Sequence, residues 1–113
     1  MGELLRGERR GPAAAVSVVE SAPDRYAVRG PLTFATARRA LDAGLGALAR
    51  ARGASIAMDC GEVGASDSAG LAVLIEWLAW ARRNGRELRF SNVPEAICAI
   101  ARICEIEGLL LGR

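Results

Sequence analysis

Apolar and polar positions follow two different periods along this chain, which predicts strands and helices in turn. Runs rich in β-branched or alternating apolar residues predict strands at residues 15–20, 25–30, 55–60 and 87–91. Runs with apolar residues every three or four positions predict helices at residues 33–52, 71–84 and from 94 onward. The order β-β-α-β-α-β-α predicts an α/β fold, a mixed sheet with an N-terminal β-hairpin, parallel central strands and helices packed against it.

Turn-forming residues predict where several of these elements begin and end. Thr33 is the expected N-cap of the first helix, and Gly53 is expected to close that helix. Residues 61–66 are expected to form a loop, and Gly85 is expected to end the second helix. The C-terminal segment 106–111 is expected to form a last short strand or turn packed on the core.

Length and composition predict one globular domain. The chain has 113 residues, of which 51% are hydrophobic and 25% charged, a balance typical of a packed core. The charged, glycine-rich residues 1–12 are predicted to be a flexible leader, and residues 13–113 the domain. No signal peptide and no apolar run of the roughly 20 residues that span a bilayer is recognisable. We therefore expect a cytoplasmic protein with no direct membrane insertion.

The inventory of charged and nucleophilic residues excludes several functions. Fifteen basic residues, all of them arginine, and thirteen acidic ones leave a net charge of +2, too small to indicate nucleic acid as a partner. The absence of histidine removes the Ser-His and Cys-His pairs and imidazole metal sites. Three cysteines without a Cys-x-x-Cys pair are expected to be small buried hydrophobes. We expect no catalysis, no metal ion and no cofactor.

The most informative segment is the turn Asp67-Ser68-Ala69-Gly70, which joins the third strand to the second helix. Asp67 or Ser66 is expected to cap that helix, and this placement puts Ser68 in or just before its first turn. A phosphate on Ser68 would face backbone donors and the positive end of the helix dipole. Gly70 has no side chain, which would permit close approach by a partner. The alternative is that these residues serve only as a helix cap.

The second helix presents two faces when its residues are projected at 100° per residue. One face carries the expected core residues Leu71, Leu74, Ile75, Leu78 and Ala81. A second surface consists of Ala69, Val73, Glu76, Trp77 and Trp80. Its side chains are small near Ser68 and aromatic two to three turns further along the helix. Exposed aromatic side chains are common anchors of protein interfaces, so this surface is predicted to bind a partner. The alternative is that Trp77 flanks the core and Trp80 lies against a neighbouring loop.

These residues resemble a known family, the STAS domain of bacterial anti-sigma-factor antagonists, over about residues 15–111. The resemblance is most specific in the strand 56–60, at Val63 and in residues 67–72, and weaker in residues 30–33. It implies the STAS fold and places Ser68 at the position that the antagonists phosphorylate. Ala69 departs from the family's usual serine or glycine at the third place of the turn.

Within the family the chain is most similar to the MlaB-type subunits of the Mla phospholipid transporter, on residues 76–77, 80–82 and 90–94. That resemblance implies a non-catalytic regulatory or assembly subunit that binds the ABC ATPase at the inner membrane and supports outer-membrane lipid asymmetry. Ser68 and the exposed helix face would lie at the ATPase contact. The alternative is an anti-sigma-factor antagonist, in which unmodified Ser68 permits binding to a kinase and phosphorylated Ser68 blocks it.

Overall fold

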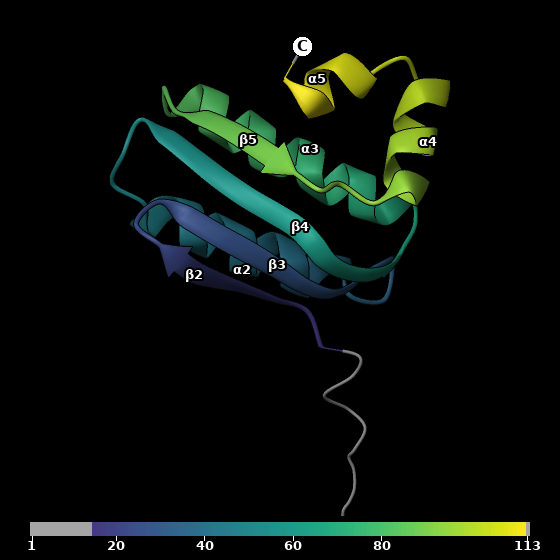
Figure 1. Cartoon of the computed structure of the whole chain (residues 1–113), viewed down its shortest axis with the longest axis horizontal. Helices are drawn as coiled ribbons and strands as arrows, with labels where there is room; N and C mark the ends of the chain where they lie inside the picture. Colours follow the sequence, from purple (N-terminus) through teal and green to yellow (C-terminus); the bar gives the residue numbers. More distant parts are fainter. Residues whose placement is uncertain (1–14, 113) are drawn as a thin grey trace, which may run out of the picture.

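The computed structural model describes residues 15–112, which form one mixed sheet with helices packed against it (Figure 1). The predicted leader, residues 1–12, lies outside the described residues. The elements in chain order are β2 (Ser17–Ala22), β3 (Arg25–Leu32), α2 (Ala37–Arg50), β4 (Ser55–Ser66), α3 (Ser68–Arg83), β5 (Glu87–Ser91), α4 (Glu95–Ile103) and α5 (Glu107–Leu111). The predicted α/β fold with an N-terminal hairpin is confirmed.

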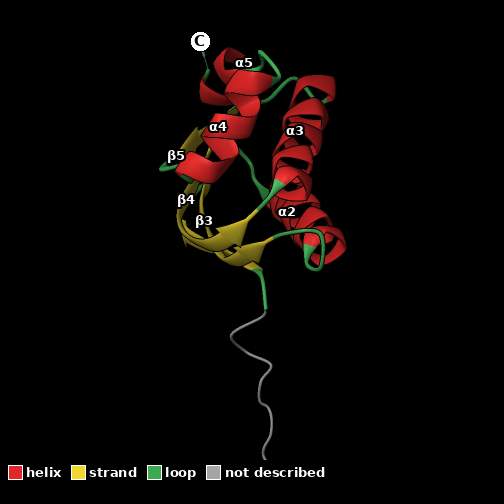
Figure 2. Cartoon of the chain, turned by 90° about the vertical axis from the view of Figure 1, so that its right-hand side faces the viewer, coloured by secondary structure: helices red, strands yellow, loops and turns green. Residues whose placement is uncertain are grey.

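The four-stranded sheet has the order β2-β3-β4-β5. Strands β2 and β3 form the antiparallel hairpin, while β3 and β4, and β4 and β5, pair in parallel. Because parallel strands end at the same edge, the connections from β3 to α2 and from β4 to α3 lie side by side at one end of the domain (Figure 2). The segment with the predicted functional turn is therefore next to a loop more than thirty residues earlier in the chain.

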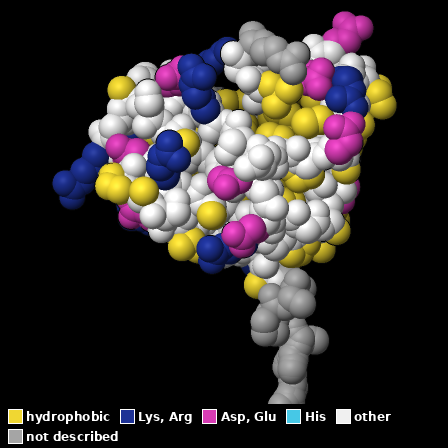
Figure 3. Space-filling model, in the orientation of Figure 1, with side chains coloured by type: hydrophobic (Ala, Val, Ile, Leu, Met, Phe, Trp, Pro, Cys, Tyr) yellow, Lys and Arg dark blue, Asp and Glu magenta, His cyan; other side chains and the backbone are white. Residues whose placement is uncertain are grey.

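Helices α2 and α3 cover one face of the sheet, and the other face is open (Figure 2). Along β4 the side chains of Ile56, Met58 and Cys60 are buried beneath the helices, while Asp59 lies on the open face. The open face carries the ion pair between Arg29 and Glu62, at 2.9 Å. Charged side chains of both signs are scattered over this face, and hydrophobic atoms gather toward α4 and α5 (Figure 3).

The contact between α2 and α3 is built around Trp77, whose side chain is 0% exposed. Its indole Nε1 donates a hydrogen bond to the carbonyl oxygen of Leu41 at 3.2 Å, so the buried polar atom of the ring is satisfied. A Cβ atom on Gly44 would lie 2.0 Å from Cε2 of Trp77. Glycine is therefore required at position 44, although glycine inside a helix costs about 1 kcal/mol relative to alanine.

Both predicted boundaries of the first helix are wrong. Helix α2 begins at Ala37 with Thr36 as its N-cap residue, because residues 33–36 form a turn in which the Thr36 hydroxyl donates to the carbonyl oxygen of Pro31 at 2.8 Å. The helix ends at Arg50, and Gly53 does not close it. Instead the backbone N–H of Gly53 donates to the carboxylate of Asp24 at 3.0 Å.

Residues 61–66 and 106–111 also differ from the prediction, whereas the glycine after α3 agrees with it. Residues 61–66 are not a loop but the second half of β4, which pairs with β3 as far as Leu32 and Ser66. This half of β4 has two register shifts beside it and no partner on its β5 side, which explains its weak strand signal. The segment 106–111 contains the short helix α5 instead of a strand. Gly85, with φ +66°, follows α3 as predicted.

Candidate functional site

Asp67 fastens two segments of the chain together at the end of the sheet. It is the N-cap of α3, one of the two residues expected in this place, and its Oδ1 accepts hydrogen bonds from the backbone N–H groups of Ala69 (2.9 Å) and Gly70 (3.3 Å). Its Oδ2 accepts a third bond from the backbone N–H of Phe34 at 3.1 Å. One carboxylate therefore fixes the start of α3 and the turn before α2 relative to each other.

Ser68 is the first residue of α3, and its side chain is exposed. A phosphate on Ser68 was expected to face backbone donors, but two of the donors at this helix start, the N–H groups of Ala69 and Gly70, are already engaged by Asp67. A phosphoryl group here would add about −1.5 to −2 charge beside an existing carboxylate, although the helix dipole still favours an anion at this end. Phosphorylation of Ser68 therefore stays a prediction, and its local effect would be competition with Asp67.

Phe34 is 85% exposed beside this cap, and the sequence analysis missed it. A helix starting at Thr33 would place Phe34 on the same stripe as Leu41, seven positions later, and therefore in the core. Because α2 starts at Ala37, Phe34 belongs to the preceding turn and lies outside the stripe. An aromatic side chain this exposed is unusual on a monomer and is typical of an interface anchor. The sequence offered one indication, since Phe34 directly follows residues 30–33, a segment that resembles the STAS family.

A shallow apolar groove of about 290 Å³ lies between the first turns of α2 and α3. Its lining consists of small or aliphatic residues with one charged residue from each helix: Ala37, Arg38, Leu41, Ala69, Ala72, Val73 and Glu76. Gly70 is buried next to it, and a Cβ atom there would lie 2.3 Å from the carbonyl oxygen of Leu32. The close approach that Gly70 permits is thus between α3 and β3 of the same chain, not the approach of a partner.

The predicted second surface of α3 is divided by its contact with α2. Val73 is 4% exposed and Trp77 is fully buried, because α2 covers this side of the helix. Their placement on an exposed surface is therefore wrong, although Val73 still contributes to the groove wall. Trp80 is half-buried near the other end of α3, with the Arg86 guanidinium 5.9 Å from its ring centroid. Twelve residues separate Trp80 from Ser68, about 18 Å along a helix.

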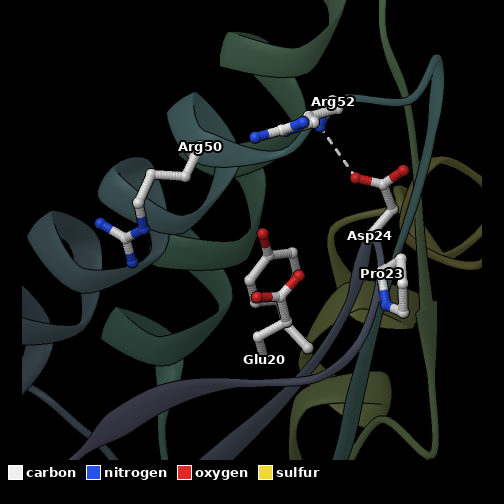
Figure 4. A pocket seen from close by; sticks show the side chains of 6 residues that line it. Glu20, Pro23, Asp24, Arg50 and Arg52 are labelled. Atoms are coloured by element: carbon white, nitrogen blue, oxygen red, sulfur yellow. Dashed lines mark hydrogen bonds between the residues drawn. The ribbon is translucent and has the colours of Figure 1, made fainter.

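A second hollow lies at the other end of β3 and is lined by Glu20, Pro23, Asp24, Tyr26, Arg50 and Arg52 (Figure 4). Its volume is about 640 Å³. The Asp24 carboxylate is occupied by the backbone N–H groups of Arg52 and Gly53, at 2.9 and 3.0 Å. Burial, with the charges of Glu20 and Asp24, raises the pKa of Tyr26, and Arg50 opposes this shift. Two acidic and two basic side chains line the hollow, so its charge favours neither an anionic nor a cationic ligand.

Burial makes the thiol of Cys60 unreactive. Burial, with a contribution from the charge of Asp59, raises the pKa of the Cys60 thiol to about 12, so this thiol is not a nucleophile at neutral pH. Among residues 15–112 no three acidic or cysteine side chains come together as metal ligands. None of the helices within the same residues is long and apolar enough to cross a membrane.

Comparison with known proteins identifies the family. A structure of the anti-sigma-factor antagonist SpoIIAA in its unphosphorylated form superposes with a TM-score of 0.63 over 82% of this chain and 83% of that chain. The two sequences are 10% identical, so this similarity shows the fold alone. No curated protein matches the sequence. Residues 18–112 match the family described as Mlab, STAS domain, and the chain therefore belongs to this family of STAS domains.

Proposed function

We propose that this protein is a non-catalytic subunit that binds the ATPase of a Mla-type phospholipid ABC transporter and supports its assembly or activity. Such a subunit would contribute to outer-membrane lipid asymmetry, and it would reach the inner membrane from the cytoplasm only through its partner. The observation that carries the proposal is the docking face at one end of the domain. This face consists of Phe34, Ser68 and the groove between α2 and α3.

The chemistry of the docking face supports binding. STAS domains are in general non-catalytic regulatory domains that mediate protein–protein interactions. The face offers one projecting aromatic ring, one apolar groove and one exposed hydroxyl, all held by the Asp67 cap. An exposed apolar surface with a polar surround is what a specific protein interface requires. The Mla-type partner is favoured by the description of the matched family, Mlab.

A second candidate function is that of an anti-sigma-factor antagonist. It is favoured by the fold shared with SpoIIAA and by the exposed Ser68 at the start of α3. In that function unmodified Ser68 would permit binding to a kinase partner. A phosphate at this position would prevent binding through charge and through the cost of removing the phosphate from water.

Co-purification of the full chain from its own host distinguishes the two functions. Recovery of a Mla-type ATPase supports the first, and recovery of a sigma-regulating kinase without a transporter ATPase overturns it in favour of the second. The affinity of the recovered partner is then measured by calorimetry for the wild type and for Phe34→Ala. Ile103→Ala is the matched control, because Ile103 is 82% exposed at the far end of α4. We expect Phe34→Ala to weaken binding at least tenfold and Ile103→Ala to leave it unchanged.

A further inference from the structure

Building on the proposed function, we propose that the groove between α2 and α3 receives about two turns of an amphipathic helix from the ATPase. The helix inserts one large apolar side chain, with an acidic residue facing Arg38 and a basic residue facing Glu76. The protein could bind the ATPase through another surface, in which case the proposed function would hold and the groove would be unoccupied.

The size and lining of the groove indicate an aliphatic or aromatic side chain as its occupant. At about 290 Å³ it lies at the lower limit of the range of about 300–1,000 Å³ that small-molecule sites occupy. Three of its lining residues are alanines, Ala37, Ala69 and Ala72, and these leave room that larger side chains would fill. Apart from Arg38 and Glu76, the lining side chains carry no polar group. A cofactor or metabolite would find no polar partner at the base of the groove.

Both walls of the groove are helices, and this geometry favours a helical partner. An extended peptide binds by adding a strand to an open sheet edge, but both walls of this groove are helices and offer no such edge. The wall on α3 runs from Ala69 to Glu76, seven helical steps that span about 10 Å. That length matches two turns of a docked helix, which inserts apolar side chains three or four residues apart into such a groove.

The two charged residues give the groove an orientation. Arg38 and Glu76 come from opposite walls, both are exposed, and neither forms an ion pair within residues 15–112. Complementary charges at the rim of an interface select partners and fix their register. A partner helix with an acidic residue on one side of its apolar anchor and a basic residue on the other would pair with both Arg38 and Glu76. Phe34 is exposed three residues before Ala37, in the turn that precedes α2, and is available as a further contact.

Two matched pairs of variants test the proposal by calorimetry with the Mla-type ATPase of the same host. Ala72→Leu fills the groove, while Ala49→Leu adds the same side chain at an exposed position of α2 outside it. Arg38→Glu and Arg39→Glu change the net charge equally at neighbouring exposed positions of α2, but only Arg38 lines the groove. We expect losses of about tenfold or more for Ala72→Leu and Arg38→Glu, and of at most about threefold for their controls. Thermal unfolding of each variant verifies that it is folded.

Four outcomes overturn the inference. If Ala72→Leu binds the ATPase as well as the wild type, the groove is unoccupied, although wild-type binding still supports the proposed function. Equal losses for Arg38→Glu and Arg39→Glu would mean that only net charge matters. A wild-type dimer in light scattering that Ala72→Leu abolishes would assign the groove to a second copy of this chain. If the wild type itself does not bind the ATPase, the proposed function fails and the inference fails with it.

Discussion

The carboxylate of Asp67 accepts a hydrogen bond from the backbone N–H of Phe34 at 3.1 Å, while its other oxygen caps α3. The exposed aromatic ring and the exposed Ser68 are thus held by the same side chain, although 33 residues separate Phe34 from Asp67. A charge placed on Ser68 acts next to this carboxylate. We therefore expect the position of Phe34 to respond to charge at the start of α3.

Asp67→Asn separates the two tasks of Asp67. Asparagine caps helices about as well as aspartate, so the free energy of unfolding should change by less than about 1 kcal/mol. An amide has one acceptor oxygen, and if that oxygen keeps the cap, the amide NH₂ faces the Phe34 N–H group. We expect faster hydrogen exchange at Phe34 and weaker ATPase binding. Asp67→Ala should lose the cap as well, at a cost of about 1–2 kcal/mol. Unchanged exchange at Phe34 in Asp67→Asn would contradict this coupling.

Ser68→Asp tests the effect of charge beside the cap. We expect it to weaken ATPase binding because its carboxylate repels Asp67 and is desolvated at the interface. Ser68→Asn is the neutral control of nearly the same size. Calorimetry at low and high salt separates the causes, since salt screens an exposed charge but does not change the bulk of the side chain. Equal losses for the two variants would show that size, and not charge, blocks the interface.

Gly44 and Gly46 lie in the same helix but should respond oppositely to alanine. A Cβ atom at Gly44 would collide with Trp77 at 2.0 Å, and overpacking of this kind costs about 1–3 kcal/mol or more. A Cβ atom at Gly46 meets only the end of the Arg50 side chain at 3.4 Å. Gly46→Ala should therefore gain up to about 1 kcal/mol of helix propensity. Urea unfolding measures both, and a stabilised Gly44→Ala would mean that the two helices do not meet as described.

Local signals in the sequence predicted the elements well, and contacts between distant segments account for the errors. The strand Glu87–Ser91 and the glycine that follows α3 depend on neighbouring residues, and both were predicted. A helical projection shows on which side of α3 Trp77 lies, but it does not show that α2 packs on that side and buries the residue. The cap residue Asp67 was predicted from its type and spacing. Phe34 was missed because the start of α2 depends on the Thr36 turn and on pairing at the end of the sheet.

The buried Cys60 makes the stability of the domain fall at high pH. Burial, with the charge of Asp59 adding to it, raises the pKa of the thiol from 9.0 to about 12. Between these values the unfolded chain has lost a proton that the folded chain keeps, so folding is favoured less as pH rises. The contribution of Cys60 is complete below pH 9 and is lost progressively as pH rises toward 12. Tyr26, whose pKa is also raised, acts in the same direction, so a variant is needed to isolate the thiol.

Cys60→Ala should show a smaller loss of unfolding free energy between pH 8 and pH 11 than the wild type, measured by urea denaturation. The variant lowers stability at neutral pH because it leaves a small cavity, but its pH dependence should be flatter. A thiol reagent at pH 8 gives an independent test in the native protein. Cys104 is exposed, so the prediction that all three cysteines are buried is wrong for this residue, and it should react at once, whereas Cys60 should react only as the domain unfolds. Rapid labelling of Cys60 in the folded protein would contradict both its burial and the proposed source of the alkaline instability.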